Sequence, residues 1–258
     1  MTWQIKLERA KRHYAELETA LAIFFATTPY KISTRRNDER KLVYYLSEVT
    51  DVPVELSLIT GDVIQNLRSA LDHLAYDLWV REANGQGRES RIYFPIEKDQ
   101  ASYNRNKTDK TQGISQQSLA IIDTLSPYPG GNDVLWQIHT LNNRDKHRLL
   151  VTVGSSFQSL DLGAYMVASM RKMPGLPEGM RDNLPDLPLF VRPADNLFPL
   201  TVGEELFTGG VDDEKNPDMQ FRFNVLLNEP GIVEGEPVTD VLSAMVVEVE
   251  RIGPLFNI

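Results

Sequence analysis

Apolar residues recur every three to four positions in several long stretches of the chain, which is the spacing of the buried face of a helix. The first stretch is Thr2–Thr27, and its apolar residues are Trp3, Leu7, Ala10, Tyr14, Leu17, Leu21 and Phe24. Pro29 ends it, because a proline inside a helix removes a backbone hydrogen bond. The same spacing predicts a second helix from Pro53 to about Arg81 and a third over Val134–Leu150, with Asn132 or Asp133 as its cap.

Two shorter helices complete the helical pattern. Ser115–Leu125 is apolar on one face, and the Ser115 hydroxyl is a plausible cap for its first turn. A final helix opens at Pro237 and is stopped by the pair Gly253-Pro254. We therefore expect about four helices in the N-terminal half and one helix at the C-terminal end.

Strand-like composition occurs first between the first two helices. Tyr30–Arg36 and Lys41–Thr50 are rich in Tyr, Val, Ile, Thr and Leu, and the polar turn Asn37–Arg40 joins them. These residues predict a β-hairpin inserted after the first helix. An isolated two-stranded ribbon is at best marginally stable in water, so we expect the hairpin to pair with strands from the C-terminal half.

After Leu150 the residue pattern changes from helical periodicity to strand-like runs. The runs LLVTVGSSF and GAYMVASMR predict a strand pair, and Glu204–Phe207 and Met219–Leu227 predict two more strands. Met173–Pro199 contains six prolines and is expected to be an extended loop. Earlier in the chain, Ala101–Gly113 is polar without apolar periodicity, which favours a mobile loop.

These elements predict an α+β fold. An N-terminal helical bundle over residues 1–150 carries the inserted hairpin at 30–50, and residues 151–258 form an antiparallel sheet with a covering C-terminal helix. If the hairpin joins that sheet, the two halves form one compact unit. In that case a cut near residue 150 leaves no fragment that folds.

Charge divides the chain at the same place, since residues 1–150 carry a net charge of +1 and residues 151–258 a net charge of −10. The net charge is −9, yet residues 1–41 alone hold nine basic and five acidic groups. Such a basic N-terminal face can contact a phosphate backbone, or it is simply a solvated helix and hairpin. The sequence has no cysteine, which excludes disulfides, thiolate metal sites and cysteine nucleophiles. We find no secretory signal and no membrane-spanning run, so we expect a cytoplasmic protein without a membrane partner.

Polar side chains interrupt the apolar faces of the second and third long helices. On a helical projection Leu67, Leu71, Leu74 and Leu78 form the buried stripe of the second helix. Arg68 and Asp72 lie on one flank of this stripe. The other flank carries Asp62, Asn66, Ser69, His73 and Asp77. Polar side chains therefore flank the buried leucine stripe on both sides.

The third long helix places polar groups on its apolar face itself. His139, Asn142 and Lys146 lie on that face, and Asp145 lies at its edge. We expect these side chains to face the helix of Arg68 and His73, with a buried Lys146 paired to Asp62, Asp72 or Asp77. Burying such groups is costly unless they pair with one another. The cluster is either a structural network or a ligand site.

Three chemistries can be weighed for the cluster. A carboxylate–histidine metal site lacks the spacings E-x-x-H and H-x-x-x-H, and a lysine in the cluster repels a cation. A serine hydrolase lacks G-x-S-x-G. Metal-free acid–base chemistry on RNA needs an imidazole that titrates near neutral pH and a guanidinium that clamps phosphate.

Arg68 and His73 form the motif R-x(4)-H within NLRSALDH. This resembles the R-x(4–6)-H motif of the HEPN superfamily, bacterial helical-bundle proteins that include many ribonucleases of toxin–antitoxin and phage-defence systems. The resemblance implies that the Arg and His promote attack of a ribose 2′-hydroxyl on the adjacent phosphate, with two copies meeting across a dimer. Ser69 departs from the Asn, Asp or His that often follows the arginine, and the β-rich C-terminal half is unusual for this family.

A wider pattern over Gly61–Leu150 resembles a family of uncharacterised bacterial proteins. It comprises NLRSALDHLAYDL, then FPI, a PY turn and LNNRDKHRLL. This second resemblance implies no activity.

The predicted function is a HEPN-like RNA-cleaving or RNA-binding protein that needs no metal or cofactor. Arg68 holds phosphate, His73 is acid or base, Asn66 and Asp72 orient them, and the facing wall is formed by Lys146, Asn142, His139 and Asp145. The expected partners are RNA, an antitoxin or other partner protein, and a second copy in a homodimer. One alternative is a non-enzymatic module that binds a small molecule or a protein, with the cluster as a packing network. The other alternative is a metal-binding helical bundle.

Overall fold

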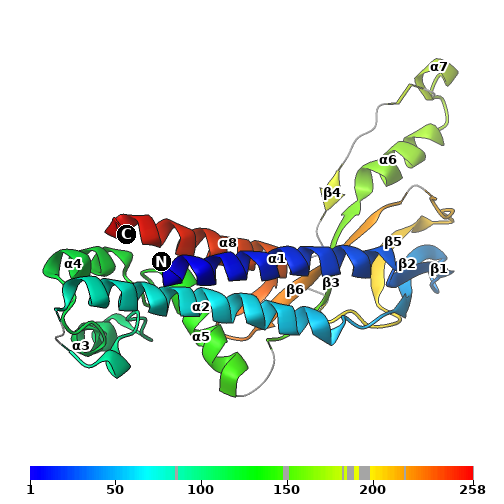
Figure 1. The fold of residues 1–258 in the computed structure, drawn as a ribbon. Coiled ribbons are helices and arrows are strands. Elements are labelled where there is room, and N and C mark those ends of the chain that lie inside the picture. Colours follow the sequence, from blue (N-terminus) through cyan, green and yellow to red (C-terminus); the bar gives the residue numbers. More distant parts are fainter. Residues whose placement is uncertain are drawn as a thin grey trace. The chain divides into compact units, whose positions relative to one another are not determined.

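The computed structural model describes residues 1–84, 87–147, 151–181, 183–184, 189–191, 198–217 and 219–257. Within the described helices, the side chains of Lys146, His147, Ala164 and Arg181 lie outside the description. The fold is α+β, as the sequence predicts (Figure 1). The chain divides into two compact units, the first from Met1–Ile23, Pro53–Val153 and Leu227–Ile258, the second from Phe24–Val52 and Gly154–Leu226.

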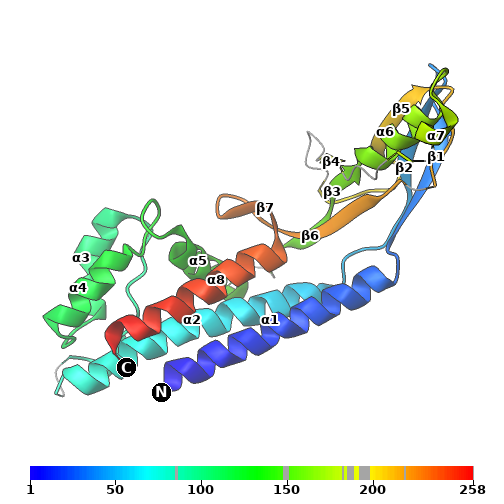
Figure 2. The ribbon, with the colours of Figure 1, turned by 90° about the horizontal axis from the view of Figure 1, so that it is seen from above.

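The first unit is built on long helices. They are α1 (Thr2–Ala26), α2 (Val54–Glu82), α5 (Asp133–His147) and α8 (Val238–Ile252). The helices α2, α5 and α8 pack on one another, and Figures 1 and 2 both show α1 alongside α2. The apolar residues of α1 named above are buried, except for a half-buried Tyr14. The helices therefore bury the faces that their 3.6-residue periodicity predicts.

Shorter elements complete this unit. They are the 3₁₀ turns η1 (Glu89–Arg91) and η2 (Gly253–Phe256), the helices α3 (Gln100–Lys110) and α4 (Gln116–Leu125), and the strand β7 (Val233–Pro237). The Ser115 hydroxyl accepts a hydrogen bond from the Ser118 amide, so its predicted capping role is confirmed. At the other end of the chain, Gly253 lies against the Trp3 ring. A Cβ atom at Gly253 would lie 2.0 Å from that ring.

The second unit holds the hairpin and most of the strands. The hairpin is β1 (Tyr30–Arg36) and β2 (Lys41–Val49), and β2 pairs antiparallel with β5 (Glu205–Val211). The prediction that the hairpin joins C-terminal strands is confirmed. A second sheet has the strand order β4 (Phe190–Val191), β3 (Val153–Asp161), β6 (Phe221–Glu229) and β7. Aromatic rings fill the unit, with Tyr44 against Phe207 and Phe221, and Tyr30 against Phe223.

The structure corrects two sequence predictions of loops and strands. The polar segment predicted as a mobile loop over Ala101–Gly113 is largely the helix α3. The Asp99 side chain caps α3 by accepting from the Ser102 amide, and Tyr103 anchors it by packing on Tyr128. The segment GAYMVASMR is not a strand but the helix α6 (Leu162–Arg171). The Asp161 carboxylate accepts from the Gly163 amide at its start, a local bond that favours a helix over a strand.

Two further differences concern the C-terminal half. The segment Met173–Pro199, expected to be extended throughout, contains the one-turn helix α7 (Glu178–Arg181) and β4. Residues 182, 185–188 and 192–197 of that segment lie outside the described residues. The strand β7 escaped prediction because it has only five residues, two of them glutamates. None of the described helices is long and apolar enough to cross a membrane.

Candidate functional site

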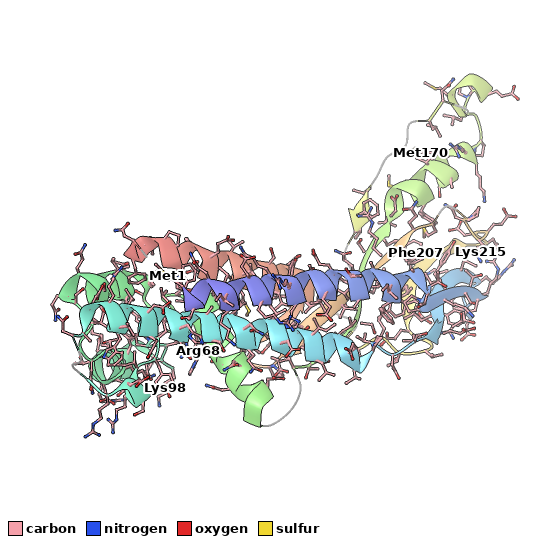
Figure 3. The ribbon with its side chains drawn as sticks, viewed as in Figure 1. Met1, Arg68, Lys98, Met170, Phe207 and Lys215 are labelled. Atoms are coloured by element: carbon pink, nitrogen blue, oxygen red, sulfur yellow. The ribbon has the colours of Figure 1, made fainter. Side chains whose placement is uncertain are left out.

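Arg68 lies in the interface of α2 with α5 (Figure 3), and it is buried, with only 7% of its side chain exposed. Its Nε donates to Nδ1 of His139 at 3.1 Å, and its Nη2 donates to the Phe94 carbonyl at 3.2 Å. Its Nη1 lies 2.8 Å from Oδ1 of Asp72. Burial lowers the pKa of Arg68 while Asp72 acts in the opposite direction. The guanidinium stays charged because arginine is not deprotonated in proteins.

Asp72 completes a clamp on the backbone of Phe94. Its Oδ1 accepts from the Phe94 amide at 3.1 Å, while Arg68 binds the carbonyl of the same residue. Phe94 and Ile96 are fully buried, so the Phe94-Pro95-Ile96 segment is anchored both by its side chains and by this ion pair. We call Arg68, Asp72, His139 and the Phe94 backbone the Arg68 network. It satisfies backbone groups that would otherwise be costly to bury.

The hydrogen bonds fix the chemical form of His139. A neutral imidazole has one acceptor nitrogen, so the nitrogen that accepts from Arg68 leaves Nε2 to carry the proton. Asn143 Nδ2 lies 3.1 Å from Nε2, so the Asn143 amide has to be flipped to present its oxygen to that N–H. Protonated His139 would point an N–H at the guanidinium, which disrupts the bond. His139 therefore serves the network as a neutral acceptor.

The remaining residues predicted on α5 have separate places. Asn142 is 3% exposed, and its Oδ1 has no hydrogen-bond partner in the part of the chain that the structure describes. The Asp145 carboxylate lies against Gly61 of α2, where a Cβ atom would be 3.0 Å from Oδ1. The glycine thus lets α5 approach α2 closely. The predicted ion pair of Lys146 falls on a side chain outside the described residues and stays a prediction.

His73 lies apart from Arg68. The two residues are five positions apart on one helix, which turns their side chains about 140° away from each other. His73 is half-buried, and among the described residues it makes no hydrogen bond. The structure joins Arg68, Asp72 and His139 in one network and leaves His73 and Asn66 on the opposite flank of α2. Among the described residues, no three His, Asp or Glu side chains gather where they could hold a metal ion.

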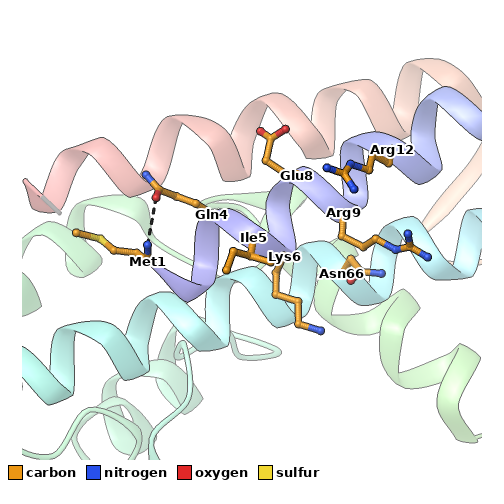
Figure 4. Close-up of a pocket in the computed structure, with 8 residues that line it drawn as sticks. All are labelled: Met1, Gln4, Ile5, Lys6, Glu8, Arg9, Arg12 and Asn66. Atoms are coloured by element: carbon orange, nitrogen blue, oxygen red, sulfur yellow. Dashed lines mark hydrogen bonds between the residues drawn. The ribbon is translucent and has the colours of Figure 1, made fainter.

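A hollow of about 490 Å³ runs along α1 on that opposite flank (Figure 4). We call it the α1 hollow, and it is lined by Met1, Gln4, Ile5, Lys6, Glu8, Arg9, Arg12 and Asn66. Lys6 and Arg9 extend towards α2, and Asn66 of α2 lies next to Arg9 (Figure 4). The Asn66 amide donates to the Asp62 carbonyl at 2.8 Å, which holds it against its own helix.

The cations of the α1 hollow differ from most others on this protein. Lys11, on the same helix, is bound to Glu8 and Glu250 at 3.2 and 2.7 Å. Lys6, Arg9 and Arg12 have no ion-pair partner in the described ranges of the chain. The hollow therefore carries an uncompensated positive charge in a protein whose net charge is −9. The spacing i, i+3, i+6 of Lys6, Arg9 and Arg12 puts them on one side of a helix, but only the structure shows a hollow there.

One hydrogen bond aligns α1 with α2. Thr2 Oγ1 donates to Oδ1 of Asp77 at 2.9 Å, and the two helices run in opposite directions (Figure 2). Lys6 lies one turn after Thr2 on α1, and His73 lies one turn before Asp77 on α2. Asn66, Asp77 and His73 fall within about 40° of one another around the α2 axis. This places His73 level with Lys6, on the flank of α2 that faces α1 and contributes to the hollow.

Comparison of the chain with protein-family models, curated proteins and solved structures found no significant match in any of the three.

Proposed function

We propose that this protein binds RNA through its phosphate backbone at the α1 hollow. The supporting observation is the set of three cations, Lys6, Arg9 and Arg12, which lack carboxylate partners among the described residues and line a concave surface. Unpaired Lys and Arg side chains bind phosphate by electrostatics and by charge-assisted hydrogen bonds. An otherwise acidic protein repels a polyanion elsewhere on its surface, which directs the RNA to this face.

The Arg68 network supports a different role for Arg68 from the one expected of it. Three of its nitrogens are engaged with His139, Phe94 and Asp72, and its side chain is 7% exposed. Phosphate contact by Arg68 would require this network to open. We therefore assign phosphate contact to the α1 hollow and packing of the Phe94 segment to the Arg68 network.

Binding of a fluorescently labelled RNA, followed by anisotropy at low salt, tests this proposal. The triple variant Lys6→Ala, Arg9→Ala, Arg12→Ala should lose most of the affinity while its melting temperature stays close to that of the unaltered protein. Lys11→Ala is the matched control, because Lys11 lies on the same helix but is already paired with Glu250. Equal binding by the triple variant, or no binding by the unaltered protein, would overturn the proposal.

A second candidate function is metal-independent RNA cleavage, favoured by the position of the half-buried His73 level with Lys6. His73 would accept the proton of a ribose 2′-hydroxyl, whose oxygen attacks the adjacent phosphorus. The bond from phosphorus to the 5′-oxygen then breaks, solvent protonates that oxygen, and a 2′,3′-cyclic phosphate remains. The phosphate-holding cation in this arrangement is Lys6 or Arg9, not Arg68.

Cleavage is separable from binding by one substitution. Cleavage by the unaltered protein should persist in EDTA. His73→Ala should abolish this cleavage, while RNA affinity and melting temperature change little. If the unaltered protein binds RNA without cutting it, the enzymatic candidate is excluded and the non-enzymatic binding module stands. A second copy or an antitoxin-like protein as partner stays a prediction, which light scattering of the purified protein and co-purification test.

A further inference from the structure

We infer that the α1 hollow takes a single strand of nucleic acid, holds it through about three phosphates and reads neither base nor duplex shape. This rests on the proposed function and names the substrate class of the same site. The inference comes from the spacing of the cations, the packing of α1 and the side chains that line the hollow.

The cations set the length of the contact. Lys6, Arg9 and Arg12 rise about 9 Å along α1 and spread over about 120° around it. A backbone that touches all three crosses the helix obliquely and covers only a few nucleotides. This is shorter than the roughly 4–16 nucleotides that typical single-strand grooves cover. The contact is therefore limited to about three phosphates.

The packing of α1 disfavours a duplex. A helix that reads duplex DNA stands free to enter the major groove, and the deep, narrow major groove of duplex RNA is closed to side chains. Here α1 lies alongside α2 (Figures 1 and 2), and Trp3, Leu7 and Ala10 are buried on its inner face. The hollow, at about 490 Å³, is the size of a small-ligand site. A flexible strand can enter such a hollow, whereas a stiff duplex cannot.

The lining excludes stacking as the source of affinity. Grooves that bind single strands tightly stack bases on aromatic side chains. None of the residues that line the α1 hollow is aromatic; Met1 and Ile5 are its apolar members, and both are exposed. Only the Asn66 amide offers neutral donors and acceptors from a second helix. Affinity should come from charge, be modest, and vary little with base sequence.

The salt dependence of binding tests the inference with the full-length protein. A contact with three phosphates of a single strand predicts a slope of log K against log salt of about −2, roughly −0.7 for each phosphate. Affinity should fall about 20-fold between 50 and 200 mM salt. The single variants Lys6→Ala, Arg9→Ala and Arg12→Ala should each reduce the slope by about 0.7, and Lys11→Ala should leave it unchanged.

Three probes complete the experiment: a labelled 12-nucleotide uridine strand, a mixed pyrimidine strand of the same length, and a 12-base-pair RNA duplex. The two strands should bind with affinities within a factor of about three, and the duplex at least 10-fold more weakly. Duplex binding as tight as that of the strands, or a slope steeper than about −4, overturns the inference and leaves RNA binding intact. If none of the probes binds at 50 mM salt, both this inference and the proposed RNA binding are overturned. Both are also overturned if polyglutamate binds and the nucleic acids do not, which would identify an acidic protein segment as the occupant.

Discussion

Arg68 illustrates how one residue type supports two opposite interpretations. Its motif with His73 resembles a phosphate-binding arginine, but its donors meet His139, Phe94 and Asp72 inside the protein. A buried guanidinium that contacts its own chain in this way stabilises packing, because removing it leaves the Asp72 carboxylate without its cation and the Phe94 carbonyl without this donor. Lys6, Arg9 and Arg12 of α1, in contrast, lack carboxylate partners among the described residues and remain available to a ligand.

The residue-scale consequence for Arg68 concerns stability. Arg68→Ala should lower the free energy of unfolding by about 3 kcal/mol, at the low end of the 3–5 kcal/mol typical of broken buried pairs. The lower value is appropriate because 29% of the Asp72 side chain is exposed, so solvent can partly rescue the carboxylate. Urea unfolding followed by circular dichroism measures this, with Arg9→Ala as the exposed control expected within about 0.5 kcal/mol of the unaltered protein. If Arg68→Ala lost no more stability than the Arg9→Ala control, the Arg68 network would contribute nothing to the stability of the fold.

Tyr30 gives a prediction on pH. Burial raises the pKa of its hydroxyl to about 12 from 10.0. Because the folded pKa lies above the unfolded one, the contribution to stability is fully present below pH 10 and is lost as the pH rises towards 12. The Tyr30→Phe variant has no group to ionise there, so its stability should decline less steeply between pH 10 and 12. Urea unfolding at several alkaline pH values measures the slopes, and parallel slopes for the two proteins would contradict the prediction.

At the scale of elements, the sequence predicts best what periodicity controls. The helices α1, α2, α4, α5 and α8 follow from apolar spacing and capping residues. The polar helix α3 has no such spacing. It is held by a local hydrogen bond from the Asp99 cap and by the tertiary contact of Tyr103 with Tyr128, and neither appears as apolar periodicity. Helix α6 is short and largely apolar, and it contains Tyr165 and Val167, residue types that strands also favour.

The sequence likewise predicts some features of the candidate site and misses others. Helical projection correctly placed His139 and Asn142 on the buried face of α5, because side-chain direction follows from residue number. It could not identify Phe94 as the partner of Arg68 and Asp72, because backbone groups carry no sequence signature. It also could not join Lys6 of α1 to the flank of α2 that carries His73, since that depends on which helices are neighbours.

The contact between α1 and η2 gives an element-scale prediction. A Cβ atom at Gly253 would lie 2.0 Å from the Trp3 ring, so Gly253→Ala must displace the ring or the start of η2. We expect a loss of about 1–3 kcal/mol in the free energy of unfolding, as is typical of overpacked cores. Thermal or urea unfolding measures it. Gly231 is unsuitable as a control because its φ is positive, whereas Gly179→Ala meets no atom within 4 Å and should be nearly neutral or slightly stabilising. Equal stability of both variants would contradict the role given to this contact.

At the scale of the whole molecule, each compact unit draws on both halves of the sequence. The first unit takes Leu227–Ile258 from the C-terminal end, and the second takes Phe24–Val52 from the N-terminal end. The chain therefore passes repeatedly between the units, through α1 and through β6. A boundary near residue 150 stays a prediction that only the behaviour of fragments can decide.

A fragment of residues 1–150 provides that test. It lacks α8, which packs on both α2 and α5 and buries Leu242, Met245, Val249 and Ile252. It also lacks β5, the partner of β2, so the hairpin would be left as an isolated ribbon. Exposing these four side chains removes burial worth roughly 1.5–3 kcal/mol each, or about 6–12 kcal/mol together, which is comparable to the margin of about 5–15 kcal/mol by which domains are stable. We expect the fragment to melt without a cooperative transition in calorimetry, whereas the full chain melts cooperatively. A sharp, reversible transition of the 1–150 fragment would show instead that its helices form a domain of their own, and that α8 is an accessory to that core.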